Sequence, residues 1–240
     1  VSLGEYYGMK ESFVKNGTLA TTKTKWTTRK EEDNPAMAYV HNLGSVSNSG
    51  KEGFMMLGYD DIYSIEYMYE KRMGYWKHDG KVTIFDAFEK LRDNYQAIME
   101  RCRAFDELIY DDAEKAGGKK YAEICSASYR QVISAHKLFT DKEGNLLWFS
   151  KENNSNGCVN TVDLTYPLFL VYNPELQKAM MTSIFEYSAS GRWNKPFPAH
   201  DLGTYPIANG QVYGGDMPIE EGGNMVILAA AISKIEGNAD

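Results

Sequence analysis

The sequence has 240 residues, of which 43% are hydrophobic and 25% charged, a composition typical of a folded globular protein rather than a disordered chain. Its formal net charge is −7, and no lysine and arginine cluster alternates with aromatic residues, so nucleic-acid binding is not expected. The longest apolar run, residues 225–232, is far shorter than the roughly 20 residues that span a bilayer, so no transmembrane segment is expected either.

Residues 1 to about 77 have the composition of β-strands. Thr, Tyr, Val, Ile and Trp are frequent in three stretches, at 17–30, 36–44 and 53–76, and clusters of Gly, Asn and Ser separate them. We therefore predict a largely extended, β-rich first third of the chain.

A helical pattern begins at Thr83. From there to Phe105, apolar residues recur at spacings of three and four, which predicts one long amphipathic helix, and Thr83 with Asp86 resembles a capping box. Gly117 and Gly118 then interrupt the pattern, and a second helix is predicted to about His136. The two helices should form a hairpin.

Further elements follow in quick succession. Residues 137–151 predict a β-hairpin that turns near 142–145, and a short helix is predicted over 162–172. Asn173 followed by Pro174 is a typical helix start, and this helix should end at Gly191. A last helix is predicted from Pro218 to Gly237.

Between these last two helices, Arg192 to Asn224 forms a long segment in which prolines and glycines exclude regular structure. Loops of this length within a compact domain are uncommon and are usually functional. The segment carries one histidine and four carboxylates: His200, Asp201, Asp216, Glu220 and Glu221. Irregular backbone at the edge of a scaffold is where such groups form sites, so we predict a candidate active site here.

Hydrolysis of an amide or glycosidic bond requires one group that protonates the leaving group and another that activates water. Asp201 and Glu221 are the predicted pair, and His200 and Glu220 are further catalytic candidates. Adjacent helix residues point roughly 100° apart, so at most one of Glu220 and Glu221 should face a shared cavity. Two structural alternatives stay open: acidic residues stabilise the first turn of a helix, and Asp201 before Leu-Gly favours a turn.

Five residues are candidates for substrate binding. Asn153 and Asp163 lie in a polar loop suited to binding hydroxyls or an amide, although such a loop can also bond to itself. Trp148 and Trp193 could stack on a sugar ring, or could pack at the edge of the core. Asp216 belongs to the long Pro/Gly segment.

Other chemistries lack a motif. The histidines and cysteines show no zinc-binding spacing, and no serine-nucleophile, Walker or dinucleotide-binding motif is present. The adjacent Asp60 and Asp61 could attract a cation, but an acidic pair alone is a weak signal. We therefore expect no metal and no cofactor.

Three long stretches, at 58–76, 150–176 and 191–232, closely resemble the fungal and bacterial glutaminase A family. The resemblance covers most of residues 54–237 and corresponds to the central region of the family. It implies the end of a β-sandwich-like domain over residues 1–78, followed over 79–240 by a helical-hairpin domain. The implied fold is mainly α with a β N-terminal part, in which a partial (α/α) six-hairpin toroid resembles that of six-hairpin glycosidases.

The same resemblance implies a fragment of a hydrolase that acts on the side-chain amide of glutamine through carboxylate acid–base chemistry. Two alternatives stay open: a glycoside hydrolase of the six-hairpin type, and a non-catalytic carbohydrate-binding or structural module. The expected partner is a small molecule, glutamine or a carbohydrate. A partial ring would expose apolar helix faces, which favours self-association. The family resemblance also implies a secreted or cell-envelope location.

Overall fold

The structure is a computed structural model that describes residues 1–20, 34–151, 156–165 and 172–238. The chain divides into two compact units, residues 1–57 and residues 58–240. Helices predominate, and strands occur in both units, so the protein is mainly α with a β part near its N-terminus. Within the described ranges, no helix combines the length and the apolar character needed to cross a membrane.

The first unit pairs two strands beside a helix. Strand β1 (Ser2–Glu5) and strand β2 (Pro35–Ala38) are antiparallel, and helix α1 (Tyr6–Asn16) follows β1 directly. The expectation that residues 1–77 are extended is therefore wrong at α1. The predicted strand at 17–30 lies largely outside the described residues.

Capping at both ends explains helix α1. The Glu5 carboxylate accepts hydrogen bonds from the backbone N–H groups of Tyr7 (3.0 Å) and Gly8 (2.8 Å), and therefore satisfies two donors of the first turn. Gly17 ends the helix in the left-handed conformation, at φ 67°. Local capping thus prevails over a composition that favours strands.

The second unit begins with a small sheet. Strand β3 (Ile65–Tyr67) is antiparallel to β4 (Glu70–Arg72), and a 3₁₀ turn, η1 (Tyr75–Lys77), follows. The other edge of β3 pairs in parallel with β7 (Ile207–Ala208), giving the order β4-β3-β7. Strand β7 lies in the segment that was predicted to lack regular structure. Its pairing depends on residues about 140 positions away, which no local pattern reveals.

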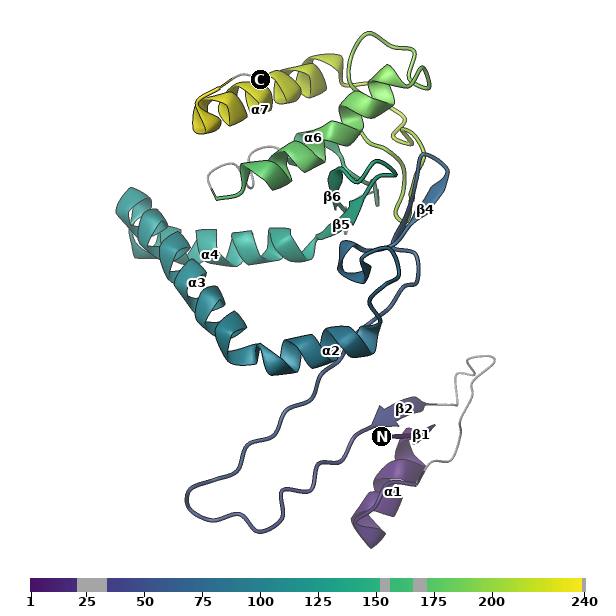
Figure 1. Ribbon diagram of the computed structural model, residues 1–240, viewed down its shortest axis with the longest axis vertical. Helices are drawn as coiled ribbons and strands as arrows, with labels where there is room; N and C mark the ends of the chain where they lie inside the picture. Colours follow the sequence, from purple (N-terminus) through teal and green to yellow (C-terminus); the bar gives the residue numbers. More distant parts are fainter. Residues whose placement is uncertain (21–33, 152–155, 166–171, 239–240) are drawn as a thin grey trace. The chain divides into compact units, whose positions relative to one another are not determined.

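The predicted helical hairpin is confirmed, with one correction. Instead of a single helix from Thr83, the chain forms α2 (Ile84–Asp93) and α3 (Tyr95–Gly117), separated at Asn94. Helix α4 (Lys119–Ser134) then packs beside α3 (Figure 1).

Caps fix the ends of these helices. Thr83 and Asp86 form the predicted capping box: the Thr83 hydroxyl oxygen accepts from the Asp86 N–H (3.2 Å), and the Asp86 carboxylate accepts from the Thr83 N–H (2.8 Å). Gly118, at φ 79°, separates α3 from α4, so the break predicted at the two glycines is also confirmed.

The later elements also agree with the sequence. Strands β5 (His136–Thr140) and β6 (Leu146–Ser150) form the predicted hairpin. Helix α5 (Val162–Thr165) begins where a short helix was expected, and residues 166–171 of that prediction lie outside the described residues. Helix α6 (Pro174–Ala189) starts after its Asn173 cap, and α7 (Pro218–Glu236) ends before Gly237 in the left-handed conformation.

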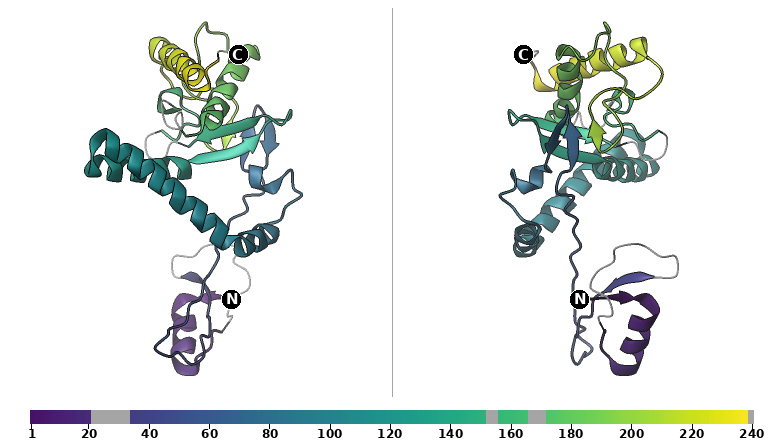
Figure 2. Two further views of the ribbon diagram at one scale, coloured as in Figure 1. Left: turned by 60° about the vertical axis from the view of Figure 1, so that its left-hand side comes forward. Right: turned by 90° about the vertical axis from the view of Figure 1, so that its right-hand side faces the viewer.

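The main core of the second unit lies where α6 and α7 pack beside each other and α6 covers the β5–β6 hairpin (Figures 1 and 2). Its fully buried side chains come from strands, helices and loops alike, and six of them are Phe139, Leu147, Phe149, Val159, Leu202 and Leu228. Each such side chain stabilises the fold by about 1.5–3 kcal/mol relative to exposure. Two of the six, Val159 and Leu202, anchor loops, so the core also fixes loop positions.

Some apolar side chains of the helices face outward. Ile124 on α4, and Val226 and Ile227 on α7, expose half or more of their surface. Self-association through such faces stays a prediction.

Candidate active site

Two loops far apart in sequence are joined by backbone hydrogen bonds. The Val159 N–H donates to the Gly203 carbonyl (2.8 Å), and the Leu202 N–H donates back to the Val159 carbonyl (3.0 Å). The Val162 N–H donates to the His200 carbonyl (2.8 Å). This ladder holds the chain that precedes α5 against the chain that follows α6, so the side chains of both loops are fixed in relation to each other.

Gly203 is required where this loop passes β7. Its φ is 141°, and a Cβ atom at this position would lie 2.2 Å from the carbonyl oxygen of Ile207. No other residue type fits such a close approach without a backbone shift. The glycine therefore lets the chain turn directly after Asp201.

Asp201 is fully buried and its carboxylate is saturated with hydrogen bonds. Oδ1 accepts from the backbone N–H groups of Gly203 (2.9 Å) and Val212 (3.0 Å), and Oδ2 accepts from the N–H of Tyr213 (3.1 Å). Oδ2 also lies 2.9 Å from Nδ1 of His200. The bond to Gly203 is the turn that was the structural alternative for this residue. A carboxylate with these four partners holds its surroundings in place.

His200 is held from three sides. Its Nδ1 faces Asp201, its backbone N–H donates to the side-chain oxygen of Gln211 (2.8 Å), and its ring stacks on Tyr213 with centroids 4.1 Å apart. An ionised carboxylate can only accept, so the Asp201 contact assigns a proton to Nδ1. The other ring nitrogen is thereby available for chemistry.

Glu221, in the first turn of α7, has the opposite environment. It is fully buried, and neither carboxylate oxygen accepts a hydrogen bond from any residue that the structure describes. Burial, followed by repulsion from Asp163, raises its pKa to about 7. The side chain of Asn224 partly offsets this rise, without the geometry of a hydrogen bond. Glu220 is exposed, so only one of the two adjacent glutamates faces inward, as helix geometry predicts.

These groups converge on His200. One atom each of Asp163, His200 and Glu221 lie within 4.8 Å of one another, and the same holds for Cys158, His200 and Asp201. We call these five residues the His200 cluster. Asp163 is its exposed member, so the cluster is open on that side. The spacing would also suit a divalent cation, although the proton-transfer chemistry considered below requires none.

Asp216 reaches the cluster only indirectly. It forms an ion pair with Lys195, and this contact holds the pKa of the Asp216 carboxyl below its usual range. Its Oδ1 also lies 3.4 Å from the side-chain nitrogen of Gln211, whose oxygen binds the His200 backbone. Asp216 thus contacts Gln211, which in turn binds the backbone of His200.

The two tryptophans are engaged in packing. Trp148 is 7% exposed and stacks on His136, with centroids 5.0 Å apart. Trp193 is half-buried, packs against Tyr187 and donates its ring N–H to the carbonyl of Phe197. These positions match the core-edge alternative. Asn153, the remaining binding candidate, lies outside the described residues.

Asp60 and Asp61, the acidic pair near the start of the second unit, each form an ion pair with a lysine. Asp60 lies 2.7 Å from Nζ of Lys77, and Asp61 lies 2.6 Å from Nζ of Lys137. Both carboxylates therefore already have a cationic partner.

Sequence reasoning missed two members of this environment. Cys158 belongs to no motif in the sequence, yet it is buried beside His200 and Asp201. Tyr213 was not singled out, yet its ring covers His200 and its N–H binds Asp201. Neither has a local signal, since both reach the cluster only when the two loops pair.

Comparison with known proteins matches residues 118–240 to the glutaminase A six helical-hairpin domain, and residues 1–112 to a domain of unknown function, DUF5127. Glutaminase A of Aspergillus oryzae is 35% identical over 234 residues, which cover 93% of this chain and 34% of that protein. A probable glutaminase of Arthroderma benhamiae is 35% identical over 127 residues, 50% of this chain and 15% of that protein. The chain thus spans about a third of the first relative's length and less of the second. No solved structure matches it significantly.

Proposed function

Because the chain belongs to the glutaminase A family, we propose that the His200 cluster supplies the acid–base groups of a hydrolase that acts on the side-chain amide of glutamine. One observation carries this proposal: Glu221 is a buried carboxyl group with no hydrogen-bond donor among the described residues, and it lies beside a ring nitrogen of His200. A carboxyl group left unsatisfied in this way is costly to keep, and such groups gather at functional sites.

Glu221 has the pKa that proton transfer at neutral pH requires. With a pKa of about 7, it is ionised in roughly half of the molecules at that pH and can both accept and donate a proton. In the proposed reaction, water attacks the amide carbon while Glu221 accepts one of its protons. The C–N bond then breaks, the proton is delivered to the nitrogen, and ammonia leaves. Glutamine and water yield glutamate and ammonia.

The neighbouring residues have supporting roles. Asp201 fixes the orientation and the tautomer of His200, whose second ring nitrogen can then hydrogen-bond to the attacking water or to the amide. Asp163 keeps the pKa of Glu221 high by charge repulsion and marks the side from which substrate enters. Asp201 is in this view a positioning residue, and Glu221 is the group that exchanges the proton.

The carbohydrate alternatives receive less support. Both relatives described above are called glutaminases, in one case probable. Trp148 is buried against His136, and the Lys195 ammonium lies over the ring of Trp193, 5.0 Å from its centroid, so both rings already have a partner where a sugar would stack. A secreted or cell-envelope location remains part of the proposal and is testable by fractionating the producing cells.

Ammonia release from glutamine tests the proposal. Glu221→Gln should reduce the rate at least about 100-fold, because loss of a general acid–base group costs this much or more. Glu220→Gln is the matched control, an identical change at the adjacent exposed residue, and should keep nearly the full rate.

Two further measurements separate the alternatives. Dialysis against EDTA should leave the rate unchanged, because the proposed reaction uses no metal ion. A loss of activity would instead indicate a metal-activated water. Hydrolysis of aryl glycosides without ammonia release from glutamine would overturn the proposal, as would an active Glu221→Gln variant.

A further inference from the structure

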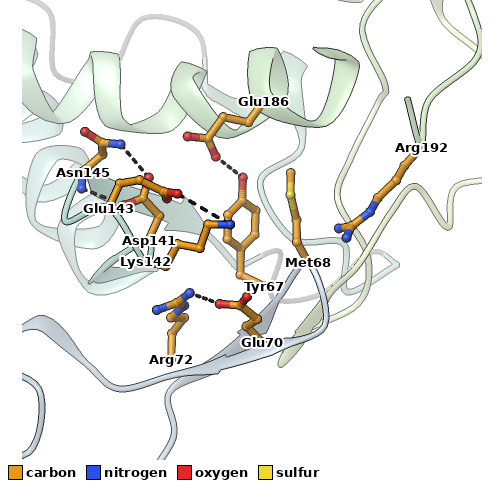
Figure 3. A pocket seen from close by; sticks show the side chains of 10 residues that line it. All are labelled: Tyr67, Met68, Glu70, Arg72, Asp141, Lys142, Glu143, Asn145, Glu186 and Arg192. Atoms are coloured by element: carbon orange, nitrogen blue, oxygen red, sulfur yellow. Dashed lines mark hydrogen bonds and ion pairs between the residues drawn. The ribbon is translucent and has the colours of Figure 1, made fainter. Parts of the chain in front are cut away.

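A cavity of about 380 Å³ lies in the second unit and shares no residue with the His200 cluster (Figure 3). Its walls come from β3 and β4, from the turn between β5 and β6, from the C-terminal half of α6, and from Arg192 beyond that helix. This volume is in the range of sites for small molecules. Most of the side chains that line it carry a charge, so a ligand must be polar.

Internal pairing satisfies four of these charges. Arg72 forms an ion pair with Glu70, and Lys142 lies 3.6 Å from Glu143. Three charged groups of the cavity make no ion pair within the described part of the chain: Asp141, Glu186 and Arg192. The cavity therefore has two carboxylates and one guanidinium available for a ligand.

The two carboxylates are fixed and close enough to repel each other. Glu186 accepts a hydrogen bond from the Tyr67 hydroxyl (2.5 Å), and Asp141 accepts hydrogen bonds from the backbone N–H (2.8 Å) and side-chain nitrogen (2.7 Å) of Asn145. Burial raises the pKa of the Glu186 carboxyl, and the charges of Asp141 and Glu143 add to the rise. A bound cation would remove this repulsion.

Arg192 provides the opposite charge. Its guanidinium lies over the ring of Tyr69, 5.2 Å from the centroid. Figure 3 shows Arg192 at one side of the cavity and Asp141 at the other, with Met68 and Tyr67 between them. A guanidinium can bind a carboxylate through two parallel hydrogen bonds. The cavity thus offers an anionic end and a cationic end.

We propose that this cavity binds a small zwitterion with a primary ammonium and a carboxylate, the chemical class of a free α-amino acid. Asp141 and Glu186 receive the ammonium, and Arg192 receives the carboxylate. This site is additional to the one that the proposed hydrolysis uses, and its existence does not depend on that reaction. A metal cation or a simple amine would use the carboxylates alone, and an anion would use Arg192 alone.

Titration calorimetry with L-norvaline tests the chemistry of the ligand. L-Norvaline has both charges and no side-chain amide, so hydrolysis cannot consume it. We expect saturable binding of L-norvaline, and binding at least about tenfold weaker for N-acetyl-L-norvaline, which lacks the ammonium, and for 1-aminobutane, which lacks the carboxylate. Equal binding of 1-aminobutane or of Ca²⁺ would overturn the proposal, as would the absence of saturable L-norvaline binding.

Variants locate the binding. Glu186→Gln and Arg192→Gln should each weaken L-norvaline binding about tenfold or more, and Arg192→Lys should restore part of it. Arg192 is exposed, so its variants decide the matter even if Glu186→Gln fails to fold. Glu221→Gln should leave binding unchanged whatever its effect on ammonia release. Binding that survives Arg192→Gln and disappears in Glu221→Gln would overturn the assignment to this cavity.

Discussion

The loop after α6 and the first turn of α7 each bury a carboxylate, but the two carboxylates differ in the hydrogen-bond donors around them. In the loop, Asp201 accepts three backbone hydrogen bonds and contacts His200. In the helix turn, Glu221 has no donor among the described residues. Both side chains are fully buried, so burial alone does not decide the role of a carboxylate. The hydrogen-bond donors around it decide whether it is a fixed anion or a proton carrier.

The strongest test of this contrast is Asp201→Asn. The new NH₂ group would face backbone N–H groups or His200 in place of an acceptor, so at least one buried donor would lose its partner. We expect the free energy of unfolding to fall by about 3 kcal/mol, measured by urea denaturation. Asp216→Asn, the same change at an exposed position of the same segment, is the control and should be much milder. An unchanged midpoint for Asp201→Asn would contradict the scaffold role.

The next largest effect concerns Glu221. Here the free energy of unfolding should depend on pH, and replacing the carboxyl group should favour the folded state as the pH rises. The pKa of Glu221 is about 7 in the folded protein against an ordinary value of 4.5. Between these two values the folded state keeps a proton that the unfolded chain has released. The stabilisation from this group is therefore fully present below pH 4.5 and is lost as the pH rises through 7.

Glu221→Gln does not titrate and should remove this dependence. Relative to the variant, the original protein should lose about 2–3 kcal/mol of unfolding free energy between pH 4.5 and pH 8. Urea denaturation of both proteins across this range measures the difference. The groups facing Glu221, namely Asp163, His200, Asp201 and Glu220, are common to both proteins. A constant difference across this range would show that Glu221 has an ordinary pKa.

The smallest effect should come from Tyr213→Leu. This change removes the ring that stacks on His200 and keeps the backbone N–H that binds Asp201. We expect a loss of about 1 kcal/mol in unfolding free energy, the scale of a single aromatic contact. Thermal unfolding measures this loss, and Tyr59→Leu, at a tyrosine of the same unit that is 83% exposed, is the control. A loss as large as that of Asp201→Asn would mean that the ring, and not the backbone, organises the loop.

The sequence allowed the helices to be predicted because their signals are local. The Thr83 and Asp86 capping box, Asn173 before Pro174, and Gly237 each act within one turn of the helix they delimit. Helix α1 was missed because the composition of residues 1–77 is typical of strands, and the Glu5 cap was not recognised against it. Strand β7 was missed because its partner, β3, is far away in sequence.

The candidate site was predictable in part for the same reason. His200, Asp201 and Glu221 stood out in a long segment rich in proline and glycine. The sequence could not distinguish the saturated carboxylate from the unsatisfied one, because the distinction depends on where the fold places the N–H groups of Val212 and Tyr213. The approach of Cys158 likewise depends on the pairing of two loops.

Gly203 lies between the small sheet and the His200 cluster, and its lack of a side chain allows the close approach of the two. Because a methyl group here would meet the Ile207 carbonyl at 2.2 Å, any larger residue would act as a wedge between β7 and the turn after Asp201. Such a substitution would displace both β7, at the edge of the sheet, and the imidazole of His200. The geometry of the site thus depends on the absence of a carbon atom at a position that itself takes no part in the proposed chemistry.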